Sequence, residues 1–261
     1  MNDQDKQKIH DLFESGRSLI GSSVSGSLSG VLGFLAGGPI AAAGAGAIGN
    51  VLGDVINKNL SKREQVRVGA TAYFALSKIK IKLAEGKTLR TDGFFEQTQG
   101  QRAKAEEIFE GVLLKVKNEH EEKKSKFIAN IFANSAFLKN ISLGEANFIL
   151  KLIERFTYKQ LCALALYNEK FAELRKQDYN NASKISFDTY GLLLQLIDLY
   201  NLGLLACRNE AGDENVVLLG PGAIIPDRIF LSEIAKKYCI VMGLEEMPRE
   251  EIINEVVIFL V

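Results

Sequence analysis

Hydrophobic and polar residues follow a helical period along most of this chain. Apolar positions three and four residues apart place one continuous apolar face on a helix. They predict helices over residues 61–85, 101–137, 142–155, 158–177, 187–199, 232–242 and 249–260. Ser142, followed three residues later by Glu145, forms a capping-box pattern that predicts where one of them begins.

One stretch departs from this pattern. Residues 18–53 contain no charged side chain, although 25% of all residues in the chain are charged. Gly37-Gly38-Pro39 in its middle predicts a chain reversal. We therefore expect two uncharged helical passes, residues 19–36 and 40–56, folded as a hairpin. Each pass would be about 25 Å long, slightly shorter than the hydrocarbon core of a bilayer is thick.

Small residues recur in this stretch at helical spacing. The members of this pattern, called the glycine zipper below, are Gly26, Gly30, Gly33, Gly37, Gly38, Ala41, Ala45, Gly49 and Gly53. Small residues four apart let helix backbones approach closely, which is how helices associate in lipid. Each glycine costs a helix about 1 kcal/mol relative to alanine in water. The pattern favours a membrane or oligomer segment, and the alternatives are a hairpin buried in a soluble protein and a flexible linker.

Four basic residues follow the zipper. This basic flank consists of Lys58, Lys62, Arg63 and Arg67. Positive residues beside an uncharged hairpin would hold both of its ends on the cytoplasmic side of a membrane. The alternative is the solvated first turn of an ordinary helix.

No pattern of catalytic residues stands out in the sequence. His10 and His120 are the only histidines, and His120 lies in the dense charge block 115–126 beside Glu119 and Glu121. Because adjacent residues of a helix do not share a face, we expect these side chains to be exposed rather than to bind a metal. The charge block as a whole is typical of a solvated face or a helix junction. We expect no enzyme activity, no metal and no cofactor.

The last part of the chain has the element order of a winged helix. An apolar helix is followed by Gly203-Leu204-Leu205, a polar turn, the apolar run 216–219 and another helix. Residues 186–261 carry five basic and twelve acidic side chains, a net charge of −7. Phosphate contacts supply most of the affinity for DNA, so this charge argues against a nucleic-acid partner.

Composition adds the cellular setting. The chain has 32 basic and 32 acidic residues and no net charge. Its three cysteines are isolated, which is typical of buried thiols in a reducing compartment. The polar first residues do not resemble a cleavable leader. We expect a cytoplasmic protein that associates with the inner membrane.

These patterns together predict a mainly α fold with a glycine-zipper hairpin, a helical bundle and a C-terminal winged-helix-like α+β module. The expected domains are an amphipathic helix (1–17), the uncharged hairpin (18–60), a helical domain (61–183) and the winged-helix-like domain (184–261).

The layout resembles a family of bacterial phage-defence proteins. A glycine-rich hairpin and a basic helix precede EEKKSKFIANIFANSAF (121–137) and ISLGEANFILKLIERFTYKQLCALAL (141–166). This order is similar to that of abortive-infection proteins of the Abi-alpha type. The resemblance implies an effector that stops the growth of an infected cell by injuring its membrane, and it implies no catalytic residues.

Three functional hypotheses follow. The first is a membrane-active effector whose partners are membrane lipid, further copies of the chain and a phage or host trigger protein. The second is a soluble oligomeric scaffold that keeps the hairpin buried. The third is a winged-helix regulator, against which the acidic C-terminal module argues.

Overall fold

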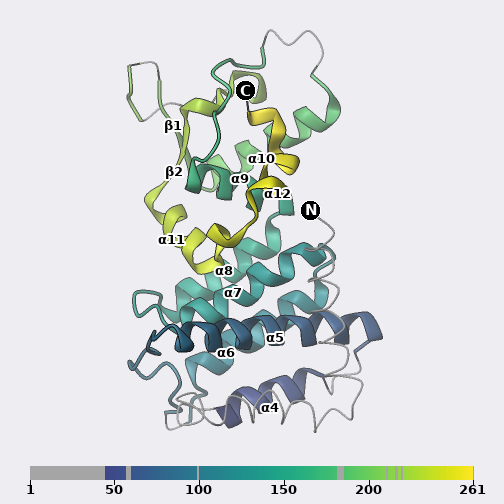
Figure 1. Cartoon of the computed structure of the whole chain (residues 1–261), viewed down its shortest axis with the longest axis vertical. Coiled ribbons are helices and arrows are strands. Elements are labelled where there is room, and N and C mark those ends of the chain that lie inside the picture. The colour runs from purple at the N-terminus through teal and green to yellow at the C-terminus, as the bar shows by residue number, and fades with distance from the viewer. Residues whose placement is uncertain are drawn as a thin grey trace. The chain divides into compact units, whose positions relative to one another are not determined.

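The computed structural model describes residues 45–56, 60–98, 100–180, 185–209, 211–214, 217–218 and 220–260 (Figure 1). The helix expected over 1–17 and the first pass of the hairpin lie outside these ranges. The described chain is mainly helical, with one small sheet, and its contacts divide it between Arg155 and Phe156. The parts before and after this division are called the N-terminal and C-terminal units.

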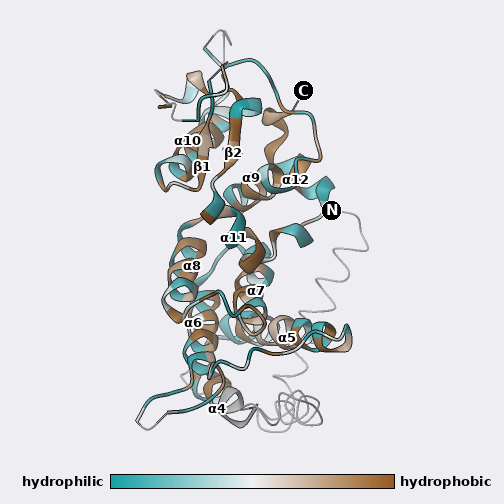
Figure 2. Cartoon of the chain, turned by 90° about the vertical axis from the view of Figure 1, so that its left-hand side faces the viewer, coloured by the Kyte–Doolittle hydropathy of each residue, from teal (hydrophilic) through white to brown (hydrophobic). Residues whose placement is uncertain are grey.

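The N-terminal unit is a bundle of helices. Its elements are α4 (Ala45–Ile56), α5 (Lys62–Ala84), α6 (Lys104–Asn118), a 3-10 turn (Glu122–Lys124), α7 (Ser125–Ser135) and α8 (Leu143–Arg155). Most of these helices carry both hydrophobic and hydrophilic bands (Figure 2). The capping box predicted for α8 is confirmed: Ser142 N–H donates to Glu145 Oε2 at 2.9 Å, and Glu145 N–H donates to Ser142 Oγ at 3.1 Å.

Helix α7 forms the core of this bundle. Every residue of α7 except Lys126 is buried, and the helix packs against α5, α6 and α8. Its Phe132 ring lies 4.8 Å from the ring of Phe109 in α6, measured between centroids. A helix buried on nearly all sides has little room for charged residues, and Lys126 is the one charged residue of α7.

Helices α6 and α8 approach each other closely at Gly111. A Cβ atom at this position would lie 3.0 Å from Cδ1 of Leu150. That distance is shorter than an ordinary van der Waals contact, so glycine allows the two helices to pack at their observed separation.

The single helical run predicted over 101–137 is wrong. It consists of α6 and α7, separated by residues 119–124. The backbone of Glu119 is extended, with φ −74° and ψ 130°, and this conformation ends α6. The junction lies in the charge block, for which a helix junction was one of the two expected structures.

Arg90 binds the end of α7 from the loop after α5. Its buried guanidinium donates to the carbonyl oxygens of Ser135, Leu138 and Ile141, at 3.2, 2.9 and 2.9 Å. It also forms an ion pair with Asp92, with Nη2 and Oδ2 2.5 Å apart. Ser135 is the last residue of α7, whose final carbonyls lack partners within the helix, and Leu138 and Ile141 lie in the segment that follows. Arg90 supplies all three carbonyls with charge-assisted hydrogen bonds.

The C-terminal unit surrounds another buried helix. Its elements are α9 (Tyr158–Glu169), α10 (Phe187–Asn201), β1 (Leu205–Cys207), β2 (Ile229–Leu231), α11 (Glu233–Met242) and α12 (Arg249–Val256), with 3-10 turns between and after them. Helix α9 packs against α10, α11, α12 and β2. The strands are antiparallel, with Leu205 opposite Leu231 and Cys207 opposite Ile229.

Three details of this unit differ from the sequence prediction. The partner of β1 is β2, not the apolar run 216–219, of which the described residues Val217 and Leu218 are not in a strand. Helix α9 ends at Glu169 because Lys170 adopts a left-handed conformation, with φ 49°. Because α9 packs on β2 and α12, it groups with the C-terminal unit, whereas the expected boundary lay at 183/184.

Replacing Arg90 should destabilise the N-terminal unit. In Arg90→Met the carbonyls at the end of α7 lose their donors, and we expect a loss of about 3 kcal/mol in the free energy of unfolding. Urea denaturation followed by circular dichroism measures this. The matched control is Arg63→Met, which removes an exposed arginine from α5 and should change stability by less than about 0.5 kcal/mol. Equal stability of the two variants would contradict the role given to Arg90.

Burial of Cys239 gives the C-terminal unit a pH dependence. Cys162, Cys207 and Cys239 are buried, and burial raises the pKa of Cys239 from its ordinary 9.0 to about 12. The unfolded chain therefore loses this thiol proton before the folded chain does, so stability falls as pH rises from about 9 towards 12. We expect Cys239→Ala to flatten this fall by about 1 kcal/mol at pH 10.

Urea midpoints measured between pH 8 and pH 10 test this expectation. Val241→Ala is the matched control, because it shortens a buried neighbour on α11 without removing a titrating group. It should lower stability equally at both pH values. An unchanged pH slope in Cys239→Ala would show that the thiol does not carry the effect.

Candidate functional site

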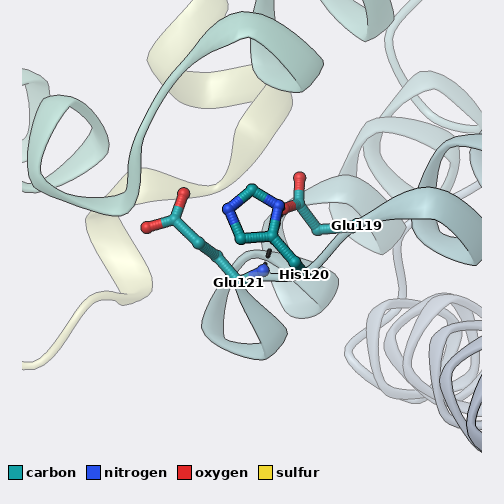
Figure 3. A group of neighbouring side chains, drawn as sticks. All are labelled: Glu119, His120 and Glu121. Atoms are coloured by element: carbon teal, nitrogen blue, oxygen red, sulfur yellow. Dashed lines mark hydrogen bonds and ion pairs between the residues drawn. The ribbon is translucent and has the colours of Figure 1, made fainter.

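Glu119, His120 and Glu121 form the one group of potential metal ligands found among the described residues (Figure 3). They follow the end of α6 and precede the 3-10 turn. The Glu119 side chain is 5% exposed and the His120 side chain 90% exposed. His120 Nδ1 lies 3.6 Å from Glu119 Oε1, and Glu121 N–H donates to the same oxygen at 2.9 Å.

A lysine already neutralises this group. Lys124 Nζ lies 2.5 Å from Glu119 Oε2 and 4.0 Å from Glu121 Oε2. The Lys124 side chain is 2% exposed, and its ammonium is 3.5 Å from the carbonyl oxygen of Glu154 in α8. The ammonium therefore supplies the positive charge that a metal would bring to Glu119.

The prediction that this group is wholly exposed is wrong for Glu119 and correct for His120. The prediction treated the three residues as neighbours on one helix, but the extended backbone of Glu119 ends α6 and turns its carboxylate inward. The carboxylate and Lys124 then form a buried ion pair across the junction of α6 and α7. A buried ion pair requires each charge to keep its partner, so this arrangement fixes the junction.

The structure describes only the end of the glycine zipper. Gly26, Gly30, Gly33, Gly37, Gly38 and Ala41 lie outside the described residues. Ala45, Gly49 and Gly53 lie on α4. Gly53 is half-buried, and a Cβ atom added to it would meet no atom within 4 Å in the part of the chain that the structure describes.

The other side of α4 is packed. Val51, Leu52 and Val55 are buried, and α4 contacts α6 and α5 (Figure 1). Asn50 and Asp54 are exposed. The last part of the uncharged stretch is therefore a helix with one face in the core of the N-terminal unit.

The described residues of the basic flank have different environments. Lys58 lies outside the described residues, and Lys62 and Arg63 are exposed in the first turn of α5. Arg67 is half-buried, and its Nη2 donates to the carbonyl oxygen of Lys117 at 2.8 Å. Arg67 thus binds the C-terminal end of α6, a structural role that its position in the sequence does not reveal.

The C-terminal unit contains a polar cavity that no sequence motif predicts. Its volume is about 520 Å³, and Lys170, Arg208 and Lys236 are among its lining residues. These three cations come from the end of α9, the residue after β1 and the first turns of α11. They share no local spacing, because the tertiary structure brings three separate segments together.

Comparison with protein-family models, with curated proteins and with solved structures gives no match to this chain. Over the described ranges, none of the helices combines the length and the apolar character needed to cross a bilayer.

Breaking the pair between Glu119 and Lys124 should destabilise the N-terminal unit strongly. We expect Glu119→Gln to lower the free energy of unfolding by about 3–5 kcal/mol, because it leaves a buried ammonium without its carboxylate. The double variant Glu119→Gln/Lys124→Met should recover part of this loss, because it removes both charges. Chemical denaturation of the two variants and of Lys124→Met completes the cycle.

His120→Ala is the matched control, since it changes an exposed neighbour and should alter stability by less than about 0.5 kcal/mol. Addition of zinc should leave the melting temperature of the wild-type chain unchanged. A zinc-dependent rise that disappears in Glu119→Gln would show instead that a metal displaces Lys124.

Proposed function

We propose that this chain is a membrane-active effector that keeps its glycine-rich segment docked on a helical bundle until a trigger releases it. The observation that carries the proposal is the packing of α4. This helix is the end of the uncharged stretch, and its apolar face is buried against α6 and α5. The bundle thereby holds one end of the segment that would act on lipid.

The energetics of α4 suit a releasable contact. A helix of 12 residues is marginal in water by itself, and α4 contains Gly46, Gly49 and Gly53. These glycines cost about 3 kcal/mol relative to alanine. Burial of three aliphatic side chains contributes roughly 5–8 kcal/mol. The difference is a few kcal/mol, which differential binding of a trigger can overcome.

The half-buried Gly53 supports a second, alternative contact of α4. A Cβ atom added at Gly53 would have no neighbour within 4 Å among the described residues, so the packing of α4 on α5 and α6 does not need a glycine there. Small residues at helical spacing allow close approach to another helix. In the released state this contact would pack zipper segments from several copies of the chain into a membrane lesion.

The biological setting follows from the resemblance to abortive-infection proteins. An effector of that kind acts on its own cell after phage infection, so it must be harmless beforehand. The docked α4 gives this chain a means of restraint. The partners in this proposal are membrane lipid of the inner membrane, further copies of the chain and a phage or host trigger protein.

Two substitutions on α4 separate docking from zipper packing. Leu52→Ala/Val55→Ala weakens docking without adding charge, and Leu→Ala in a core costs about 2–5 kcal/mol. We expect it to raise the rate of dye leakage from anionic vesicles several-fold. Gly53→Leu places a side chain in space that the described residues leave open, so it should keep the bundle as stable as wild type. When added to the double variant, it should nevertheless suppress the leakage.

The control for both is Asn50→Ala, which changes an exposed residue of the same helix and should leave leakage and stability as they are in the wild type. The proposal fails if the docking variant floats with vesicles and leaks dye no more than wild type. If Leu52→Ala/Gly53→Leu/Val55→Ala still causes full leakage, zipper packing is refuted, whereas the docking of α4 is not.

The burial of α4 also favours a second candidate, an oligomeric scaffold that never releases this helix. In that case Leu52→Ala/Val55→Ala should reduce stability or change the oligomer mass without vesicle binding. Light scattering coupled to size exclusion, run beside the leakage assay, distinguishes the two candidates.

A further inference from the structure

The polar cavity of the C-terminal unit concentrates positive charge in an acidic part of the chain. Residues 156–261 carry ten basic and fifteen acidic side chains, a net charge of −5. Three of these ten cations, Lys170, Arg208 and Lys236, line one cavity of about 520 Å³. A cavity of this volume accommodates a small molecule.

The cations are not equally engaged. Lys236 Nζ lies 2.5 Å from Glu233 Oε1, so these two charges pair within the first turns of α11. The guanidinium of Arg208 lies over the ring of Phe230, 4.9 Å from its centroid, and no ion pair of Arg208 is found among the described residues. The ring holds the guanidinium plane while its N–H groups stay available to a ligand.

The fold positions Arg208 independently of any ligand. Its backbone N–H donates to the carbonyl oxygen of Arg228 at 3.0 Å, which extends the pairing of β1 and β2 by one residue. Leu231, Ser232 and Glu233 also line the cavity, and Ser232 is the N-cap of α11. The positive end of this helix dipole therefore adds to the field of the three cations.

One acidic residue of the cavity has no ion pair among the described residues. Glu214 lines the cavity, whereas Glu233 is paired with Lys236. Because the Lys236–Glu233 pair has no net charge, the remaining charges of the cavity lining are the cations Lys170 and Arg208 and the carboxylate of Glu214. Besides the Lys236–Glu233 pair, the cavity therefore offers two cations, one carboxylate and the aromatic rings of Tyr167 and Phe230.

We propose that this cavity binds a phosphate-bearing small molecule. Arg208 contacts two phosphate oxygens through its fork of N–H groups, and Lys170 adds a point charge from the end of α9. The half-buried Phe230 ring provides an apolar surface for the rest of the molecule. The site is independent of the glycine-rich segment, because every residue that lines it lies in the C-terminal unit.

Calorimetric titration of the full chain with inorganic pyrophosphate tests the site. We expect saturable binding, about tenfold weaker in Arg208→Gln and in Lys170→Gln, because each loses a charge-assisted interaction with phosphate. Glu214→Gln should bind more tightly, because it removes a repelling carboxylate. The matched control is Lys176→Gln, which removes a cation of the same unit from outside the cavity and should bind as wild type does.

A second arm distinguishes the source of the phosphate. Vesicles containing phosphatidic acid should compete with pyrophosphate if the ligand is a lipid headgroup, and should not compete if it is a soluble molecule. If pyrophosphate does not bind but the vesicles do, and their binding depends on Arg208, the ligand of the site is a lipid headgroup. The site is refuted if neither probe binds, or if Arg208→Gln and Lys170→Gln both bind like Lys176→Gln.

Discussion

The N-terminal unit depends on the burial of α7, of which every residue except Lys126 is buried. Such a helix adds apolar area to the core, but its two ends must still satisfy their polar groups. At the start, Lys124 immediately precedes α7 and pairs with Glu119 at the end of α6. At the end, Arg90 binds the carbonyl oxygens of Ser135 and of the turn that follows. Charged residues therefore lie at both ends of this buried helix, where they fix its position.

The docking of α4 links this bundle to the proposed function. Helix α4 adds Val51, Leu52 and Val55 to the core while its glycines weaken it as an isolated helix. The described residues leave room for a larger side chain at Gly53, so their packing does not require glycine there. The proposed membrane state would give this glycine a role, because a small residue lets a second helix approach closely.

The C-terminal unit combines an acidic surface with a cationic cavity. Its net charge of −5 disfavours long contacts with nucleic acid, whose phosphates require an extended positive face. A single phosphate group needs only a few converging donors, and Lys170 with Arg208 can provide them. The proposed phosphate site is therefore compatible with a unit whose net charge opposes a polyanion.

Local sequence determined most of the helices and the start of α8 at Ser142, because helical periodicity and capping depend on residues three or four positions apart. It also determined the uncharged character of the zipper. Tertiary structure decided the rest. The pairing of β1 with Ile229–Leu231, the burial of Lys124, the capping role of Arg67 and the cavity around Arg208 each join residues that the sequence separates. Whether a charge is solvated or buried depends on what packs around it, and for Glu119 and Lys124 that was decided by the close approach of α6, α7 and α8.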